Sequence, residues 1–213
     1  MIDVRMFTVG PLQENCFFVR AEGSDRAVVI DPGEEAERLL EAQRGLGIQK
    51  VEAILLTHTH FDHVGAVAPL ARATGAPVYC PESEQPVLAN IMDYVMWPGI
   101  GPFESYEADE LVAGGEVLDL AGLRFDVRFT PGHSPGHVTY AVREENALLS
   151  GDVLFQGSVG RVDLPGGDWP TLLASIESLM AEFPDETVVY PGHMGLTTLG
   201  RERASNPFLR ELA

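Results

Sequence analysis

The segment that most constrains the chain is T-H-T-H-F-D-H at residues 57–63, which directly follows an apolar run at residues 51–56. Such a run predicts a short strand buried on both faces, and the helical spacing of apolar residues at 64–74 predicts a helix. Four side chains of this segment are of metal-ligand type: His58, His60, Asp62 and His63. Four such side chains within six residues are difficult to attribute to packing, and imidazole and carboxylate suit zinc, iron or manganese.

Three further ligand-type residues follow later apolar strands. Each comes directly after a glycine: His133, Asp152 and His193. This repetition places several strand ends at one rim, where a metal site can assemble. Only one of the six histidines, His137, falls outside this pattern. We assign it a structural role or a role behind the ligands, and we leave it out of the ligand set.

Strand-like and helix-like segments alternate along the rest of the chain. Strands are predicted at 15–20, 26–30, 51–56, 78–80, 116–120, 124–130, 138–143, 147–149 and 187–190, and helices at 34–44, 64–74, 84–93 and 170–183. The pattern favours an α/β fold with helices packed on sheets. With no linker or repeat in view, we expect a single domain over residues 1–213.

The composition excludes several classes of function. The chain has 14 basic and 32 acidic residues, a net charge of −18. Nucleic acids and anionic membranes are therefore disfavoured as partners. We find no signal-peptide pattern and no apolar run long enough to span a bilayer, so we expect a cytoplasmic enzyme. The two cysteines, Cys16 and Cys80, are expected to be buried thiols.

Several motifs resemble the metallo-β-lactamase superfamily, and within it the glyoxalase II-like hydroxyacylglutathione hydrolases of the short bacterial branch. The resemblance rests on T-H-x-H-x-D-H, on the ordered later ligands and on the segments P-L-Q-E-N-C (11–16), P-G-H-S-P-G-H (131–137), G-D-V-L-F (151–155), V-G-R (159–161) and N-P-F-L (206–209). It implies an αββα sandwich with the metal site at one edge of the two sheets. It also implies a catalytic domain that lacks the C-terminal helical domain of full-length glyoxalase II.

The resemblance further implies a role for each ligand. The first metal would bind His58, His60 and His133; the second would bind Asp62, His63 and His193; Asp152 would bridge them. Asp62 would also take part in catalysis. A hydroxide between the two divalent ions, with zinc favoured over iron or manganese, would attack the carbonyl of a small-molecule thioester. Whether the chain forms a homo-oligomer stays open.

Other residues have two interpretations. Asp31 is either a turn cap or an outer partner that orients a ligand histidine. Arg161 either braces its loop, which we favour, or contacts substrate. Four aromatic residues either wall a pocket for an apolar acyl chain or cap the core: Tyr94, Trp97, Phe103 and Tyr106.

Competing functions also remain open. A persulfide dioxygenase would hold one iron through His58, His133 and Asp152. Members of that branch carry Cys-Gly-Arg after the Gly-Asp, whereas V-G-R stands at 159–161 here, which favours the hydrolase. A lactonase or β-lactamase would use the same metal site. The net charge and the scarcity of cations near the late motifs weaken the case for glutathione as the thiol.

Overall fold

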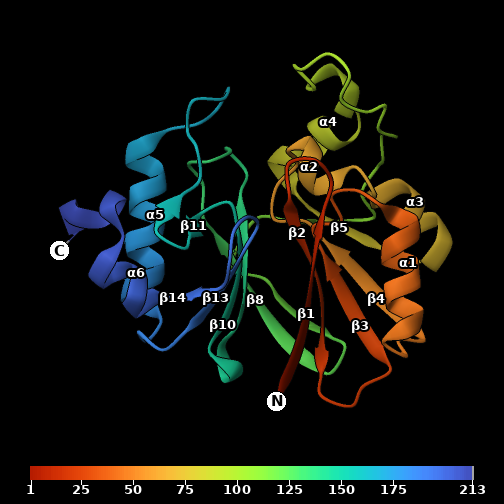
Figure 1. The fold of residues 1–213 in the computed structure, drawn as a ribbon, viewed down its shortest axis with the longest axis horizontal. Coiled ribbons are helices and arrows are strands. Elements are labelled where there is room, and N and C mark those ends of the chain that lie inside the picture. The colour runs from red at the N-terminus through yellow and green to blue at the C-terminus, as the bar shows by residue number, and fades with distance from the viewer. Residues whose placement is uncertain (213) are drawn as a thin grey trace. The chain divides into compact units, whose positions relative to one another are not determined.

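A computed structural model describes residues 1–212 of the chain. The described chain divides into two compact units, which we call the N-terminal unit and the C-terminal unit. The first consists of Met1–Val112 and Asp119–Leu123, and the second consists of Ala113–Leu118 and the described part of Arg124–Ala213. Figure 1 traces both units along the chain.

The N-terminal unit is built on a six-stranded sheet in the order β1-β2-β3-β4-β5-β6. Its strands are β1 (Ile2–Val9), β2 (Glu14–Ala21), β3 (Arg26–Ile30), β4 (Lys50–Leu55), β5 (Val78–Pro81) and β6 (Glu110–Val112). The first three strands pair antiparallel, and β3 to β6 pair parallel. The parallel part matters for function because it brings the carboxyl ends of β3 and β4 together.

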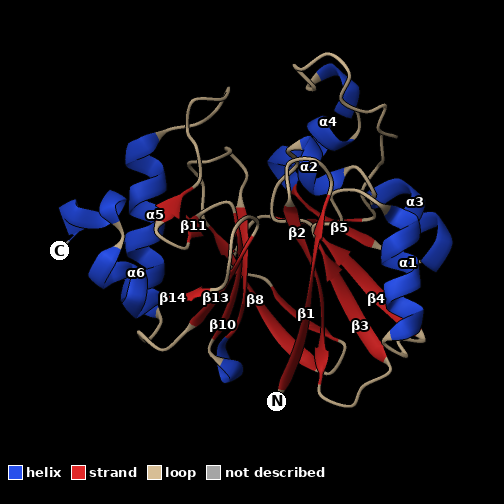
Figure 2. Cartoon of the chain, viewed as in Figure 1, coloured by secondary structure: helices blue, strands red, loops and turns tan. Residues whose placement is uncertain are grey.

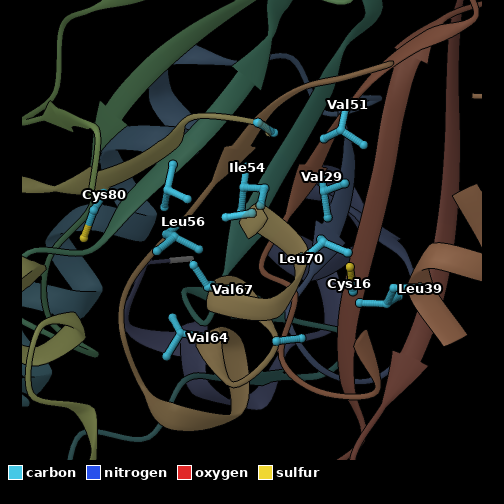
Figure 3. Close-up of a cluster of buried hydrophobic side chains, with 14 of the residues drawn as sticks. Cys16, Val29, Leu39, Val51, Ile54, Leu56, Val64, Val67, Leu70 and Cys80 are labelled. Atoms are coloured by element: carbon cyan, nitrogen blue, oxygen red, sulfur yellow. The ribbon is translucent and has the colours of Figure 1, made fainter. Parts of the chain in front are cut away.

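Helices α1 (Ala36–Gly45) and α3 (Val67–Thr74) pack on this sheet. They bury Leu39 and Leu70 in one apolar cluster with Val29 and Ile54 of the sheet. Figure 3 shows this cluster, in which both cysteine side chains also lie. Both cysteines are free and buried, as predicted, and burial raises the pKa of each thiol.

The C-terminal unit carries the second sheet, in the order β14-β13-β10-β9-β8-β7. Its strands are β7 (Val117–Leu120), β8 (Leu123–Phe129), β9 (Val138–Val142), β10 (Ala147–Gly151), β13 (Val188–Pro191) and β14 (Thr197–Thr198), and a separate hairpin joins β11 (Leu154–Phe155) to β12 (Ser158–Val159). Helices α5 (Trp169–Glu182) and α6 (Leu199–Ser205) bury Leu172, Ile176 and Leu199 against this sheet.

The α/β class predicted from the sequence is confirmed, as the alternation of strands and helices in Figure 2 shows. The helix predicted at 170–183 is α5; Pro170 lies in its first turn, and the Asp168 carboxylate caps it by accepting from the Thr171 amide. Among residues 1–212, no helix is long and apolar enough to cross a membrane. The single-domain assignment stays a prediction.

Two predicted helices are broken in the structure. The helix predicted at 64–74 begins earlier, as α2 (Phe61–Val64), and restarts as α3. The break lies at Gly65, where a Cβ would meet the Gly33 carbonyl and the Phe103 ring. The helix predicted at 84–93 is only α4 (Gln85–Leu88), flanked by the 3-10 turns η1 (Glu82–Glu84) and η2 (Ile91–Asp93). Strands β1 and β6, short β14 and helix α6 were not predicted.

Candidate metal centre

The parallel pairing of β3 and β4 positions the candidate ligands of the N-terminal unit. Ile30 pairs with Leu55 at the ends of these strands, and Asp31, one residue beyond Ile30, meets Thr57, two residues beyond Leu55. The Asp31 carboxylate accepts the Thr57 backbone N–H at 2.7 Å and the Thr57 hydroxyl at 2.6 Å. Asp31 is buried and adopts a left-handed φ of 48°. This buried carboxylate therefore fixes the entry to the histidine motif.

Hydrogen bonds around Asp31 set the proton positions on two histidines. The Thr57 hydroxyl donates to Asp31, so at its 3.0 Å contact with His58 Nδ1 the oxygen must accept. His63 Nδ1 lies 3.1 Å from Asp31 Oδ2, and a carboxylate can only accept. Both histidines therefore carry their proton on Nδ1, which leaves the Nε2 lone pair for a metal. Of the two interpretations of Asp31, the contact with His63 Nδ1 favours the orienting role, which stays a prediction.

The four ligand-type residues of the N-terminal unit lie together. His58 Nε2 is 3.1 Å from His60 Nδ1, and the rings of His58 and His63 have centroids 4.2 Å apart. His63 Nε2 lies 3.9 Å from Asp62 Oδ2 at the start of α2. Nitrogen ligands about 2.0–2.1 Å from a tetrahedral zinc lie roughly 3.3 Å apart, so this donor set fits a divalent metal.

A buried carboxylate that sequence reasoning missed supports the same loop. Thr59, between the two loop histidines, donates its hydroxyl to Glu84 Oε2 at 2.7 Å. Both residues are buried, with 1% and 4% of their surfaces exposed. Glu84 is 25 residues away, and the only sequence signal at this position is a charged residue in an amphipathic stretch. This hydrogen bond fixes the side chain of the residue that stands between His58 and His60 in the sequence.

The candidate ligands of the C-terminal unit are positioned by another parallel pair, β10 and β13. Gly151 pairs with Pro191, and the Gly192 amide donates to the Gly151 carbonyl at 2.9 Å. The residues that follow, Asp152 and His193, therefore come together, with His193 Nε2 3.6 Å from Asp152 Oδ2. His133 Nε2 lies 3.5 Å from the same oxygen. One carboxylate oxygen thus faces two imidazoles.

The loop after β12 orients His133. His133 Nδ1 lies 2.7 Å from the Arg161 carbonyl oxygen, which can only accept, so this imidazole also presents Nε2 as a lone pair. The Arg161 guanidinium forms a two-point ion pair with Asp163 at 2.6 and 2.7 Å. A Cβ at Gly160 would collide with the Asp152 carbonyl and lie 3.1 Å from His133 Nδ1. Arg161 therefore acts here through its backbone.

His137 is differently placed. Its Nε2 accepts the backbone N–H of Asp152 at 3.1 Å, and its Nδ1 faces the Thr130 hydroxyl at 3.1 Å. The lone pair that a metal would need is thus directed at a backbone amide. His137 is fully buried, and it positions Asp152 from behind.

The end of the chain braces the β11–β12 hairpin through a second buried carboxylate missed from the sequence. Glu202, 1% exposed, accepts from the Gly157 amide and from the Asn206 side chain, each at 2.8 Å, and from Thr197. Asn206 also donates to the Ser158 carbonyl at 2.9 Å. The Asn-Pro stretch, which carried family resemblance only, therefore supports the hairpin that leads to Gly160.

Comparison with known proteins identifies the family. The family model described as the metallo-beta-lactamase superfamily matches residues 9–193. The chain belongs to the metallo-β-lactamase superfamily. It is 34% identical to hydroxyacylglutathione hydrolase GloC of Haemophilus influenzae, over 98% of each chain. The predicted family is confirmed, and the superfamily makes the protein a metal-dependent hydrolase.

Two solved structures are also similar along their whole length. The B3 metallo-beta-lactamase BLEG-1 is 39% identical with a TM-score of 0.90, and the match covers 99% of this chain and 100% of that one. TTHA1623, solved in a di-iron-bound form, is 45% identical with a TM-score of 0.85, and the match covers 97% of this chain and 100% of that one. These matches confirm the predicted fold class of two sheets with helices. Because TTHA1623 binds iron, family membership does not select zinc.

Proposed function

We propose that the protein is a thioester hydrolase of the hydroxyacylglutathione hydrolase type that binds two divalent metal ions. His58, His60 and His133 hold the first ion, Asp62, His63 and His193 hold the second, and Asp152 bridges them. The observation that carries the proposal is the common orientation of His58, His63 and His133. In each, Nδ1 contacts an acceptor of the protein, so the ring proton lies on Nδ1 and Nε2 is the nitrogen that carries the lone pair.

The bound ions supply Lewis-acid activation of water and stabilise negative charge on the carbonyl oxygen. The protein contributes rigid placement. Asp62, whose side chain is 13% exposed, can accept a proton from the attacking water while binding the second ion. A thioester suits such a site because its thiolate leaves without a proton donor. The similarity to GloC supports this substrate class.

A second candidate is β-lactam hydrolysis, which the likeness to BLEG-1 favours. A β-lactam carbonyl can be attacked by the same activated water, but its amide nitrogen must be protonated as it leaves. The ring protons of His133 and His137 lie on Nδ1 and face the Arg161 carbonyl and the Thr130 hydroxyl, so neither imidazole is placed to protonate a leaving nitrogen. We therefore rank the thioester first.

The experiment combines metal analysis with a substrate panel. The purified protein is reconstituted separately with zinc, manganese and iron, and bound metal is counted. Each form is then assayed with S-lactoylglutathione, a neutral thioester, a lactone, a β-lactam and, on an oxygen electrode, glutathione persulfide. We expect two ions per chain and thioester turnover without oxygen uptake. One ion per chain with iron-dependent oxygen consumption would establish the dioxygenase instead.

A further inference from the structure

An exposed apolar segment lies in the N-terminal unit at residues 92–97. Four of its side chains are 41–54% exposed: Met92, Tyr94, Met96 and Trp97. Scattered apolar side chains are ordinary at a surface, but four within six residues form a patch of the kind that marks a binding site. Methionine adapts its shape to varied apolar ligands, and tryptophan offers a large rigid face.

This segment is attached to the metal motif through Phe61. Phe61 stands between His60 and Asp62 in the sequence, and its ring centroid lies 5.5 Å from that of Trp97. On its other side Phe61 stacks on Phe103 at 5.8 Å, with an interplanar angle of 20°. The exposed indole is thus in direct contact with the first residue of α2, the helix that carries two candidate ligands.

Two close contacts hold Phe103, at the C-terminal end of the loop, in place. The Phe103 ring occupies the space above Gly65, where a Cβ would approach it to 2.7 Å. The Phe103 amide lies 3.2 Å from the Met92 sulfur. Residues 92 and 103, the two ends of the loop, are therefore joined, and the loop is fixed on α2. The patch is therefore a fixed part of the folded surface.

The charge of the loop selects the kind of ligand. Residues 91–106 contain two charged side chains, Asp93 and Glu104, and neither is a cation. One cation that contacts the loop, Arg72, is bound to both oxygens of Glu104 at 2.7 and 3.0 Å. A glutathione carboxylate or a nucleotide phosphate gains no cation here, whereas a hydrocarbon chain gains burial.

We propose that residues 92–97 bind the apolar acyl chain of the substrate, so that the enzyme prefers thioesters of medium-length aliphatic acids. The proposal rests on the thioester hydrolysis proposed above. The acyl group is the part of the substrate that fits, because Trp97 contacts Phe61 and Phe61 lies within the metal motif, where the scissile carbonyl binds. The thiol part of the substrate lies outside this surface.

The test is an acyl-length series on a neutral thiol. N-acetylcysteamine thioesters of acetate, butyrate, hexanoate and octanoate are assayed with the zinc- and the manganese-loaded protein. We expect kcat/KM to rise about twofold per methylene, the gain that half-burial of each methylene gives, or roughly 15-fold over the four methylenes from butyryl to octanoyl. Trp97→Ser and Met96→Ser should flatten this rise. Leu111→Ser, which changes a side chain 50% exposed on β6 of the same unit, should keep it.

A second measurement does not depend on turnover. Trp169→Phe leaves Trp97 as the only tryptophan of the chain. The probe is the amide analogue of the octanoyl substrate, in which an NH group replaces the thioester sulfur. It should shift the Trp97 emission to shorter wavelength, and the amide analogue of the acetyl substrate should not. A response to the octanoyl amide without hydrolysis of any thioester would refute the proposed hydrolysis while supporting the acyl surface.

Two results would overturn the inference. One is acyl-length-independent kcat/KM together with an unchanged Trp97 emission. The other is a dimer in sedimentation velocity that Trp97→Ser converts to a monomer while the acyl-length profile stays flat. That result would assign the patch to a second copy of the chain.

Discussion

The contact between Thr59 and Glu84 gives the sharpest test of how the histidine loop is held. Thr59 separates His58 from His60, and its hydroxyl donates to a buried carboxylate at 2.7 Å. Thr59→Val keeps the size and the β-branching of the side chain and removes only the donor. Glu84→Gln keeps an acceptor and removes the charge. The two variants therefore separate the hydrogen bond from the packing.

The structure sets the expected magnitudes. A hydrogen bond to a charged group contributes about 1.5–3 kcal/mol, and both partners here are buried, so Thr59→Val should lower the free energy of unfolding by about 2 kcal/mol. A neutral acceptor forms a bond roughly half as strong, so Glu84→Gln should cost about 1 kcal/mol. The double variant should cost less than the sum of the two, with a coupling energy of about 1 kcal/mol.

The assay is urea unfolding of the metal-free protein, followed by zinc titration of each folded variant. Because the Thr59 contact orients the residues on either side, Thr59→Val should also weaken zinc binding by about tenfold, as loss of outer partners of metal ligands does. Thr59→Ser, which retains the hydroxyl, should recover most of the affinity. Additive unfolding energies, or a Thr59→Val protein with wild-type stability and affinity, would refute the reasoning.

Three further predictions follow from the same geometry. Asp31→Asn should place an amide donor against Nδ1 of His63 and so force that ring into the other tautomer. Metal binding, measured by competition with a chelator, should weaken about 10- to 100-fold. Gly160→Ala should lower the melting temperature and kcat because its methyl collides with the Asp152 carbonyl, whereas Gly45→Ala, with open space around its Cβ, should do neither. Asp152→Ala should lose both ions in elemental analysis, while His137→Ala should retain two ions per folded chain despite its lower stability; an emptied site in His137→Ala would overturn the ligand assignment.

The candidate ligands could be picked out from the sequence because the patterns that mark them are local. A strand that ends in glycine and a ligand, or in T-H-x-H-x-D-H, is visible within ten residues. The partners behind them are not local: Asp31 meets Thr57 across 26 residues, and Glu84 meets Thr59 across 25. Register between strands decides these contacts, and a buried carboxylate looks like a surface one until its partners are known.

The broken helices have the same explanation. The helical spacing of apolar residues at 64–74 gave no sign of a break at Gly65, because spacing alone does not show what packs against a residue. The residue is glycine because Phe103 and the Gly33 carbonyl occupy the space of a side chain. The helix predicted at 84–93 is helical only over Gln85–Leu88, and at its start Glu84 turns inward to bind Thr59. Tertiary contacts outweighed local propensity at both places.

The two units use one physical device to position their candidate ligands. In each, two parallel strands end side by side, so residues distant in sequence meet where backbone hydrogen bonding stops: Asp31 beside Thr57, and Asp152 beside His193. Acceptors from the protein then fix Nδ1 of His58, His63 and His133 during folding. The tautomers are therefore selected before any metal binds, and metal affinity should depend on these acceptors as strongly as on some ligands. The sharpest consequence concerns His133, whose acceptor is a backbone carbonyl. No substitution of the Arg161 side chain removes that carbonyl, so Arg161→Ala should retain metal affinity unless the loop itself moves.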